Sequence, residues 1–329
     1  MSSPLHSISL RSSSHLQGGT ITWRIKDSST SKKSVRILIT QTYSWIYTSG
    51  RCDNGQIATN QLVAGSVETL TCSPSSPSSF GIVSAIPYCT DVSSLSGVAI
   101  GQGSDIVSLS QVRRPGNDMF NNAPVAAVMF PINIQQNHKT LITVSVSDPD
   151  GDIIRCRWAN SLNGVDECSS IAASGYAIAL MVEDFINSSS TTPLSSAPVQ
   201  FIVKIITPPS CSILPEVFLT GESYTPVKVN ETFISQLLVS LTKLTSLLYY
   251  KTLTMAPTIY QLGYQVMCTI VLNSQCLQSS QYCFTIYVTE NGTTECPRVI
   301  NNATPVTAST SILSTATAPY QLKYQHACE

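Results

Sequence analysis

The sequence predicts an all-β protein built from tandem antiparallel β-sandwich domains. Apolar and polar residues alternate in short runs along most of the 329-residue chain, and Pro- and Ser-rich segments separate these runs. Alternation with a period of two gives a strand one buried and one solvated face. Charged residues make up 11% of the chain, which is less than half of the roughly 25% usual in soluble domains. At about 100 to 150 residues per domain, the length predicts two or three domains.

We expect residues 1–17 to form a loose Ser-rich segment and residues 18–118 to form the first domain. The run 73–80 carries two prolines and five serines, so it is predicted to be a loop. Gly101 and Gly103 interrupt the last strand pattern and predict a bulge or a hairpin turn. The strand patterns of this domain cover residues 18–25, 35–45 and 96–110.

Residues 119–207 are predicted to form the second domain, and a tight corner is its clearest feature. A strand pattern ends at Ser147, the run Asp148-Pro149-Asp150-Gly151-Asp152 follows, and a second strand pattern covers 153–158. Pro and Gly favour a turn between the two strands. The other strands of this domain are expected at 125–130, 140–147, 176–183 and 199–206.

The third domain is expected to cover residues 208–293. Its clearest element is a hairpin, in which strands 263–272 and 281–289 flank a polar loop. Apolar residues in the segment 232–248 fall near a 3.6-residue period, so a helix competes there with a strand, and the surrounding β patterns favour the strand. Residues 294–329 are rich in Thr, Ser, Ala and Pro, which predicts a disordered, O-glycosylated stalk.

Eleven cysteines predict disulfide bonds and an oxidising compartment, because no pair has zinc-ligand spacing. The odd number leaves at least one cysteine unpaired or paired outside this chain. A register centred on the loop of the third-domain hairpin places Cys268 opposite Cys283, and we predict that disulfide. Cys156 and Cys168 bracket a short polar segment and are predicted to form another. Three pairings stay open in the first domain, among Cys52, Cys72 and Cys89.

Asp148, Asp150 and Asp152 form a candidate calcium site, because Ca²⁺ prefers six to eight oxygen ligands and alternate carboxylates at a corner can converge on one ion. The alternative is an Asx-type turn, in which the aspartate oxygens accept hydrogen bonds from backbone N–H groups. Glu183 and Asp184 are either further ligands or caps of a strand end. We expect no cofactor other than calcium.

Four sequons predict N-glycosylation at sites expected in loops, at strand edges or in the tail. The acceptor residues are Asn187, Asn230, Asn291 and Asn302.

Neither the histidines nor the tryptophans indicate an active site. The four histidines lie in polar or terminal stretches, outside any motif for a nucleophile or a catalytic metal, so they are predicted to be solvated. The tryptophans alternate with apolar residues and are predicted to lie in the core rather than to stack on a sugar. These residues are His6, His15, His138 and His326, and Trp23, Trp45 and Trp158.

The run Val144–Trp158 resembles the Asp-x-Asp-Gly-Asp corner of cadherin-like and immunoglobulin-like extracellular modules. With the segments 18–24, 182–185 and 193–201, the longer run 145–159 is similar to a group of uncharacterised multi-domain extracellular proteins of invertebrate animals. The resemblance covers most of residues 18–290. It implies secretion and an array of β-sandwich domains.

These patterns predict a non-enzymatic extracellular protein for adhesion, recognition or matrix structure, with a protein or glycan partner. Alternatives are carbohydrate binding through exposed aromatic residues of the first or third domain, and a secreted hydrolase. A net charge of −1 argues against nucleic-acid binding. No apolar run is long enough to span a membrane. The first ten residues lack the apolar core of a secretory leader, so we expect the leader to be missing from this sequence.

Overall fold

A computed structural model describes most of the chain between residues 16 and 291 and parts of both termini. Nearly all of its regular structure is β-strand, which confirms the predicted all-β class. No helix among these residues is long and apolar enough to cross a membrane. The described residues are 8–9, 16–26, 35–47, 51–59, 61–63, 68–72, 83–85, 87–93, 97–109, 114, 119–127, 131–159, 175–208, 214–220, 224–240, 248–272, 277–291, 309–312 and 322–325.

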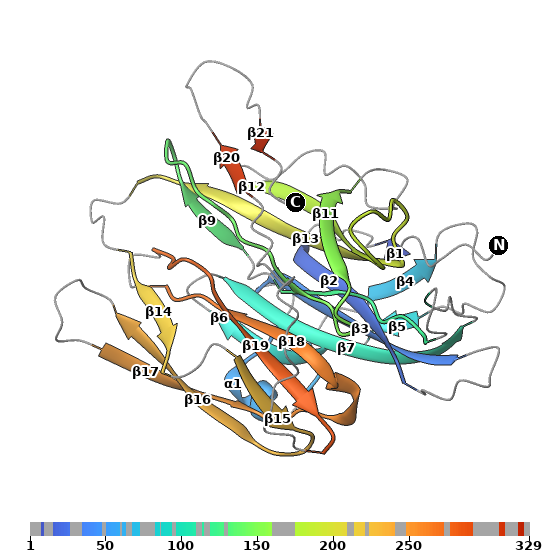
Figure 1. Cartoon of the computed structure of the whole chain (residues 1–329). Coiled ribbons are helices and arrows are strands. Elements are labelled where there is room, and N and C mark those ends of the chain that lie inside the picture. The colour runs from blue at the N-terminus through green and yellow to red at the C-terminus, as the bar shows by residue number, and fades with distance from the viewer. Residues whose placement is uncertain are drawn as a thin grey trace.

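One large sheet of eight strands crosses the middle of the molecule (Figure 1). Seven strands follow the order β11-β12-β13-β2-β3-β7-β6 with antiparallel pairing, and β9 adds to β13 in parallel. Their bounds are β2 Leu16–Ile25, β3 Val35–Ile46, β6 Tyr88–Ser93, β7 Val98–Leu109, β9 Ile132–Gln135, β11 Ile153–Trp158, β12 Gly175–Phe185 and β13 Ser195–Ile206.

The large sheet crosses the domain boundary expected after residue 118. Strand β13 hydrogen-bonds to β2, with Val199 opposite Thr20 and Phe201 opposite Gly18. Strands from residues 18–118 and from residues 119–207 therefore share one sheet, so the division at residue 118 does not separate two independent sandwiches. Periodicity within a strand shows which face is buried, but it does not show which strand is the neighbour.

The first core covers β2, β3 and β7 and is centred on Trp45, which is 2% exposed. Strand β7 runs without a break through Gly101 and Gly103, so no hairpin turn occurs there. A bulge lies instead in the partner β6, between Cys89 and Asp91. A Cβ atom on Gly101 would lie 2.6 Å from Val63 and 3.0 Å from Trp45, so close packing explains this glycine.

The second core lies under β12 and β13. Their apolar residues, such as Val182 and Phe201, pack against Ala126 and Val144. Ala126 belongs to β8, Val125–Ala127, which pairs with β10, Ser145–Ser147. The carboxylate-rich corner follows β10 directly, so its position depends on this core.

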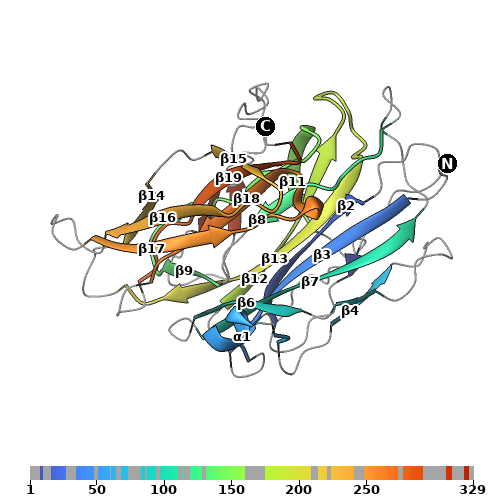
Figure 2. The same cartoon turned by 90° about the horizontal axis from the view of Figure 1, so that it is seen from below.

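Residues 214–289 form two three-stranded sheets, which lie to one side of the large sheet (Figures 1 and 2, orange). Residues of both sheets, including Ile286 and Leu253, share a third core. Strand β16 lies in the segment 232–248, for which the sequence allowed either a helix or a strand. The predicted hairpin is present as β18 and β19. The bounds are β14 Glu216–Leu219, β15 Tyr224–Lys228, β16 Phe233–Ser240, β17 Leu248–Met255, η2 Ile259–Gln261, β18 Gly263–Thr269 and β19 Tyr282–Thr289.

Short elements complete the described structure. Strand β1, Ile8–Ser9, lies within the segment 1–17 that was expected to be loose, and it pairs with β4, Glu68–Cys72. Strand β4 also pairs with β5, Val83–Ala85, and α1 covers Asn54–Ala58. In the predicted stalk, β20 and β21 pair, and the rest of residues 294–329 lies outside the described residues. Their bounds are Ser309–Ile312 and Leu322–Gln325.

Candidate functional site

The corner between β10 and β11 is a tight turn stabilised by the Asp148 side chain. The Gly151 N–H donates to the Asp148 carbonyl at 3.2 Å, and Gly151 has a φ of +76°, which favours glycine. Asp148 Oδ1 accepts hydrogen bonds from the N–H groups of Asp150 at 2.9 Å and Asp152 at 3.0 Å. The Asx-type turn considered from the sequence is therefore present.

The same turn gathers three carboxylates in a largely buried place. One side-chain oxygen from each of Asp148, Asp150 and Asp152 lies within 4.8 Å of the others. Asp148 is 5% exposed, and the Asp152 side chain is 3% exposed. All these donors are hard oxygens, which suit calcium or magnesium better than zinc or copper.

Two asparagines that precede β8 complete the polar cluster. Asn122 donates from its backbone N–H and from Nδ2 to the two oxygens of Asp150, at 2.7 and 2.8 Å. Its Oδ1 accepts from the Ile25 N–H at 2.9 Å, which ties the corner to the end of β2. Asn121 is 2% exposed and donates to Asp184 Oδ2 at 2.6 Å. No signal in the sequence indicated either asparagine, because both reach the aspartates through contacts between segments far apart in the chain.

Glu183 and Asp184 lie on opposite faces of β12, as neighbouring residues of a strand do. Asp184 is fully buried beside Asn121, and its Oδ1 accepts from the Ser195 N–H at 2.5 Å. Glu183 instead forms a salt bridge with Arg157, with an Nε to Oε1 distance of 2.8 Å. Asp184 therefore belongs to the corner cluster and Glu183 does not.

Two arginines face the carboxylates. Arg114 forms a salt bridge with Asp152 through Nη2 and Oδ1. Arg24, on β2, is 9% exposed and donates from Nη1 to the Leu262 carbonyl at 2.5 Å. Burial lowers the pKa of Arg24 to about 10, and the negative charges of Asp150 and Asp148 oppose this change. Arg24 therefore remains charged at neutral pH.

Burial and mutual repulsion make ionisation of the carboxylates costly. Burial raises the pKa of Asp148 well above its usual range, and the charge of Asp184 adds to this effect. Burial raises the pKa of Asp184 to about 6, although hydrogen bonds from Asn121 and Ser195 oppose the shift. For Asp152, burial again raises the pKa and Arg114 lowers it. The surroundings of the cluster therefore disfavour the ionised form of these carboxyl groups.

Two disulfide bonds lie within the described part of the chain. Cys268 and Cys283 pair across the β18–β19 hairpin, as the spacing predicted, with a Cα–Cα distance of 4.1 Å. Cys52 and Cys89 form the second bond, which selects one of the three pairings left open in the first domain. The predicted partner of Cys156, Cys168, lies outside the described residues.

The predicted glycan acceptors that the structure describes lie at the surface. Asn187, Asn230 and Asn291 are exposed, and Asn302 lies outside the described residues. Asn187 Oδ1 accepts from the Ser189 N–H at 3.0 Å, so this sequon forms an exposed turn.

The aromatic and histidine predictions had mixed outcomes. Trp23 and Trp45 are buried, as predicted, whereas Trp158 is 38% exposed. The core prediction for Trp158 was wrong because this residue ends β11, an edge strand of the sheet. His138 is exposed as predicted, and the other three histidines lie outside the described residues.

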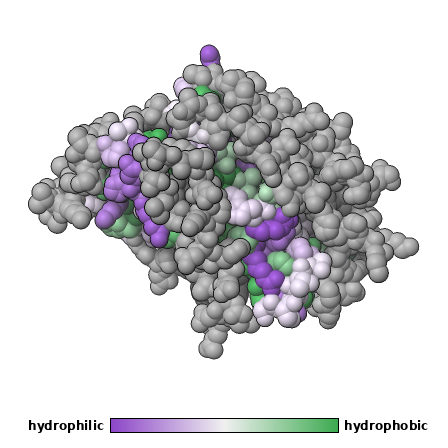
Figure 3. All heavy atoms as spheres, turned by 90° about the horizontal axis from the view of Figure 1, so that it is seen from above, coloured by the Kyte–Doolittle hydropathy of each residue, from purple (hydrophilic) through white to green (hydrophobic). Residues whose placement is uncertain are grey.

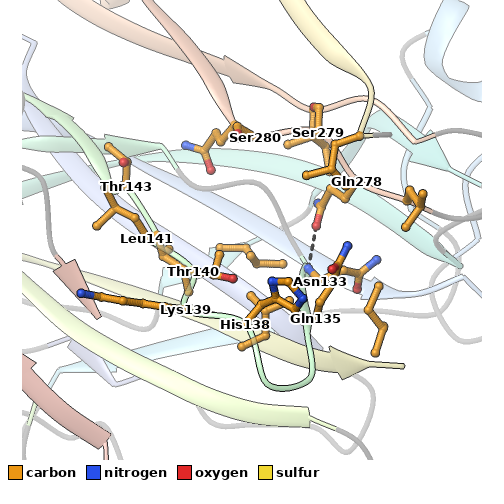
Figure 4. A pocket seen from close by; sticks show the side chains of 18 residues that line it. Asn133, Gln135, His138, Lys139, Thr140, Leu141, Thr143, Gln278, Ser279 and Ser280 are labelled. Atoms are coloured by element: carbon orange, nitrogen blue, oxygen red, sulfur yellow. Dashed lines mark hydrogen bonds between the residues drawn. The ribbon is translucent and has the colours of Figure 1, made fainter. Parts of the chain in front are cut away.

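A cavity of about 460 Å³ lies between two parts of the chain, which are β9 with the segment after it and the connection between β18 and β19 (Figure 4). The Gln278 side chain accepts from the Asn133 N–H at 2.6 Å and donates to the Pro131 carbonyl at 3.2 Å. Gln278 thus pairs with the edge of β9 as a neighbouring strand would. Apolar residues such as Leu141 and Leu277 line the cavity together with amides and hydroxyls.

The fold and the disulfides define a disulfide-bonded all-β protein with a buried carboxylate cluster. A scan against protein-family models finds no match to this chain. A search of curated proteins also finds no significant match.

Proposed function

We propose that this chain is a non-enzymatic extracellular protein that serves adhesion, recognition or matrix structure. Two disulfide bonds support an oxidising compartment. The low content of charged residues and the exposed sequons support the same assignment. The cadherin-like and immunoglobulin-like character suggested by the corner remains part of this proposal.

The cavity beside β9 is the observation that carries the proposal of recognition. Among the described residues, its lining combines aliphatic side chains with amides, hydroxyls, one histidine and one lysine, and it includes no carboxylate and no cysteine. Such a lining can bind a ligand through apolar contacts and a few directed hydrogen bonds. The described lining residues do not combine a nucleophile with an adjacent base and an orienting acid, as a hydrolase requires.

An attachment assay tests this proposal. Beads coated with the full chain are presented to cells and to purified matrix, and attachment is compared with that of the variant Leu141→Asp. Leu141 lines the cavity and is 55% exposed, so a carboxylate there should disturb binding without disturbing a core. We expect attachment to fall several-fold.

The matched control is Ile234→Asp, because Ile234 is 63% exposed and lies on β16, outside the cavity lining. Attachment of this control should equal that of the wild type. The proposal fails if wild-type beads attach to nothing. It also fails if protein purified from its native source has all its cysteines reduced.

Carbohydrate binding is a second candidate, and the exposure of Trp158 favours it. An exposed tryptophan at a sheet edge can stack on a sugar ring. This position differs from the first and third domains considered from the sequence. The face drawn in Figure 3 shows small groups of hydrophilic and hydrophobic residues side by side among the coloured residues. A glycan array that responds to the wild type and the control Tyr47→Ala, but not to Trp158→Ala, would support this candidate.

A further inference from the structure

We propose that the corner Asp148–Asp152, together with Asn121, binds one calcium ion. An acidic turn alone does not carry this inference, because aspartates are common in turns. The second observation concerns buried oxygens without partners. Asp148 Oδ2, Asp152 Oδ2 and Asn121 Oδ1 are all buried and have no hydrogen-bond partner.

The turn supplies hydrogen-bond donors to only one of the two oxygens of the Asp148 carboxylate. Oδ1 accepts both backbone hydrogen bonds of the turn, whereas Oδ2 remains buried without a donor. The Asp152 carboxylate likewise has one paired and one unpaired oxygen, because Arg114 contacts Oδ1 and leaves Oδ2 without a partner. A buried acceptor without a partner destabilises the folded state, and the cost is larger when the acceptor is charged. A bound cation removes this cost at both carboxylates.

The orientation of the Asn121 amide is set by its neighbours. Its Nδ2 donates to Asp184 Oδ2 at 2.6 Å, to Ser195 Oγ at 3.2 Å and to the Asn122 carbonyl at 3.0 Å. Because an ionised Asp184 can only accept hydrogen bonds, the NH₂ group must face it. The carbonyl oxygen of the amide is therefore the atom left without a partner. Asp184 and Asn122 act as positioning residues in this arrangement.

The charges in the cluster match a divalent cation. Four carboxylates, those of Asp148, Asp150, Asp152 and Asp184, are accompanied by the guanidinium groups of Arg24 and Arg114. Two negative charges remain when the four carboxylates are ionised. One divalent ion neutralises them.

The ligand type favours a hard divalent ion, and we expect calcium because the turn does not have to supply a strict octahedron for it. The available donors are carboxylate and amide oxygens, which exclude a preference for zinc or copper. One oxygen from each of the three aspartates lies within 4.8 Å of the others, which allows all three to bind one ion at Ca–O distances of about 2.4 Å. Magnesium requires shorter distances of about 2.0 to 2.1 Å and a stricter octahedron.

The variant Asp148→Asn tests the site with the least disturbance of the fold. An asparagine keeps the oxygen that accepts from Asp150 and Asp152, so the turn can persist. It replaces the second oxygen with an NH₂ group, which cannot bind a cation. The control is Asp91→Asn, because Asp91 is exposed and its Oδ1 likewise accepts from a backbone N–H, that of Val92 at 2.8 Å.

The measurement is a calorimetric titration of the chelator-treated, disulfide-intact full chain with CaCl₂, with MgCl₂ as a parallel titrant. We expect one calcium ion per chain with a Kd on the order of 10⁻⁴ to 10⁻³ M, the range of extracellular modules, and weaker binding of magnesium. Asp148→Asn should weaken calcium binding at least about tenfold, a loss of roughly 1.4 kcal/mol, and Asp91→Asn should not weaken it.

Three outcomes would overturn the inference. The first is a wild-type chain that shows no saturable calcium heat and no calcium-dependent rise in its thermal midpoint. The second is an Asp148→Asn variant that binds as the wild type does, and the third is an equal loss in both variants. The wild-type titration decides the matter even if a variant does not fold. The calcium site is independent of the proposed adhesion, because the attachment assay can fail while calcium still binds.

Discussion

The core around Trp45 and the corner at Asp148 are both almost fully buried, yet they are built differently. The first is an apolar cluster beside the disulfide Cys52–Cys89. Its buried polar atoms without partners are neutral and include the donors Gln41 Nε2 and Trp45 Nε1. At the corner, two of the atoms without partners are carboxylate oxygens. The comparison teaches that burial stabilises one region, whereas in the other it leaves carboxylate oxygens without partners, which points to a ligand.

The largest expected effect is the loss of the Trp45 side chain. Trp45 is 2% exposed and contacts Tyr43, with ring centroids 5.6 Å apart. Trp45→Ala should lower the free energy of unfolding by about 3 to 5 kcal/mol, because it leaves a cavity in the core. Urea unfolding measures this loss, which should be the same with calcium and with chelator. A loss that depended on calcium would break the contrast between the two regions.

Removal of the disulfide bond Cys268–Cys283 should have the next largest effect. The bond Cys268–Cys283 closes a loop with a sequence separation of 15, for which chain entropy predicts about 3 kcal/mol. The double variant Cys268→Ser, Cys283→Ser should lose about this much in urea unfolding. Retention of the full wild-type stability would show that strand pairing alone holds the hairpin.

The charge at the corner should have a smaller effect that depends on pH. Because burial raises the pKa of Asp148 in the folded state, its favourable contribution is present at low pH and is lost as pH rises through the folded-state pKa. In chelator, Asp148→Asn should therefore stabilise the protein more at pH 8 than at pH 5, by an amount on the order of 1 kcal/mol. Urea unfolding at both pH values checks this. A pH-independent difference would contradict the conclusion that burial makes ionisation of Asp148 costly.

The smallest effect is expected at the exposed sequon of Asn187. Ser189→Ala removes the hydroxyl that the sequon requires but keeps the N–H that donates to Asn187. Stability should change by less than about 0.5 kcal/mol, as at most surface sites. Intact-mass analysis of secreted protein should show the loss of one N-glycan. An unchanged mass would mean that this asparagine carries no glycan.

The sequence predicted individual strands better than it predicted which strands pair with each other. The alternation in residues 153–158 and the symmetry of the β18–β19 hairpin were enough to place β11 and the bond Cys268–Cys283. The pairing of β13 with β2 joins residues far apart in the chain, and a period of two carries no information about such pairing. Trp158 was assigned to the core because alternation does not reveal that a strand lies at an edge.

The candidate site was predicted only in part for the same reason. The three aspartates of the corner lie within five residues, so turn chemistry brings them together locally. Arg24 reaches the cluster from β2, Asn121 from the segment before β8, and Arg114 through its ion pair with Asp152, and no local spacing encodes these contacts. The role of Asp184 depends on its face of β12, and that face became clear only from its hydrogen bond to Ser195.

A crystal structure of the chain grown with calcium tests the central claim most directly. We predict anomalous density for one ion bound at about 2.3 to 2.6 Å to Asp148 Oδ2 and Asp152 Oδ2, with Asn121 Oδ1 as a further ligand. A calcium-soaked crystal in which these oxygens instead accept hydrogen bonds from an arginine or from water, with no anomalous density between them, would contradict the claim.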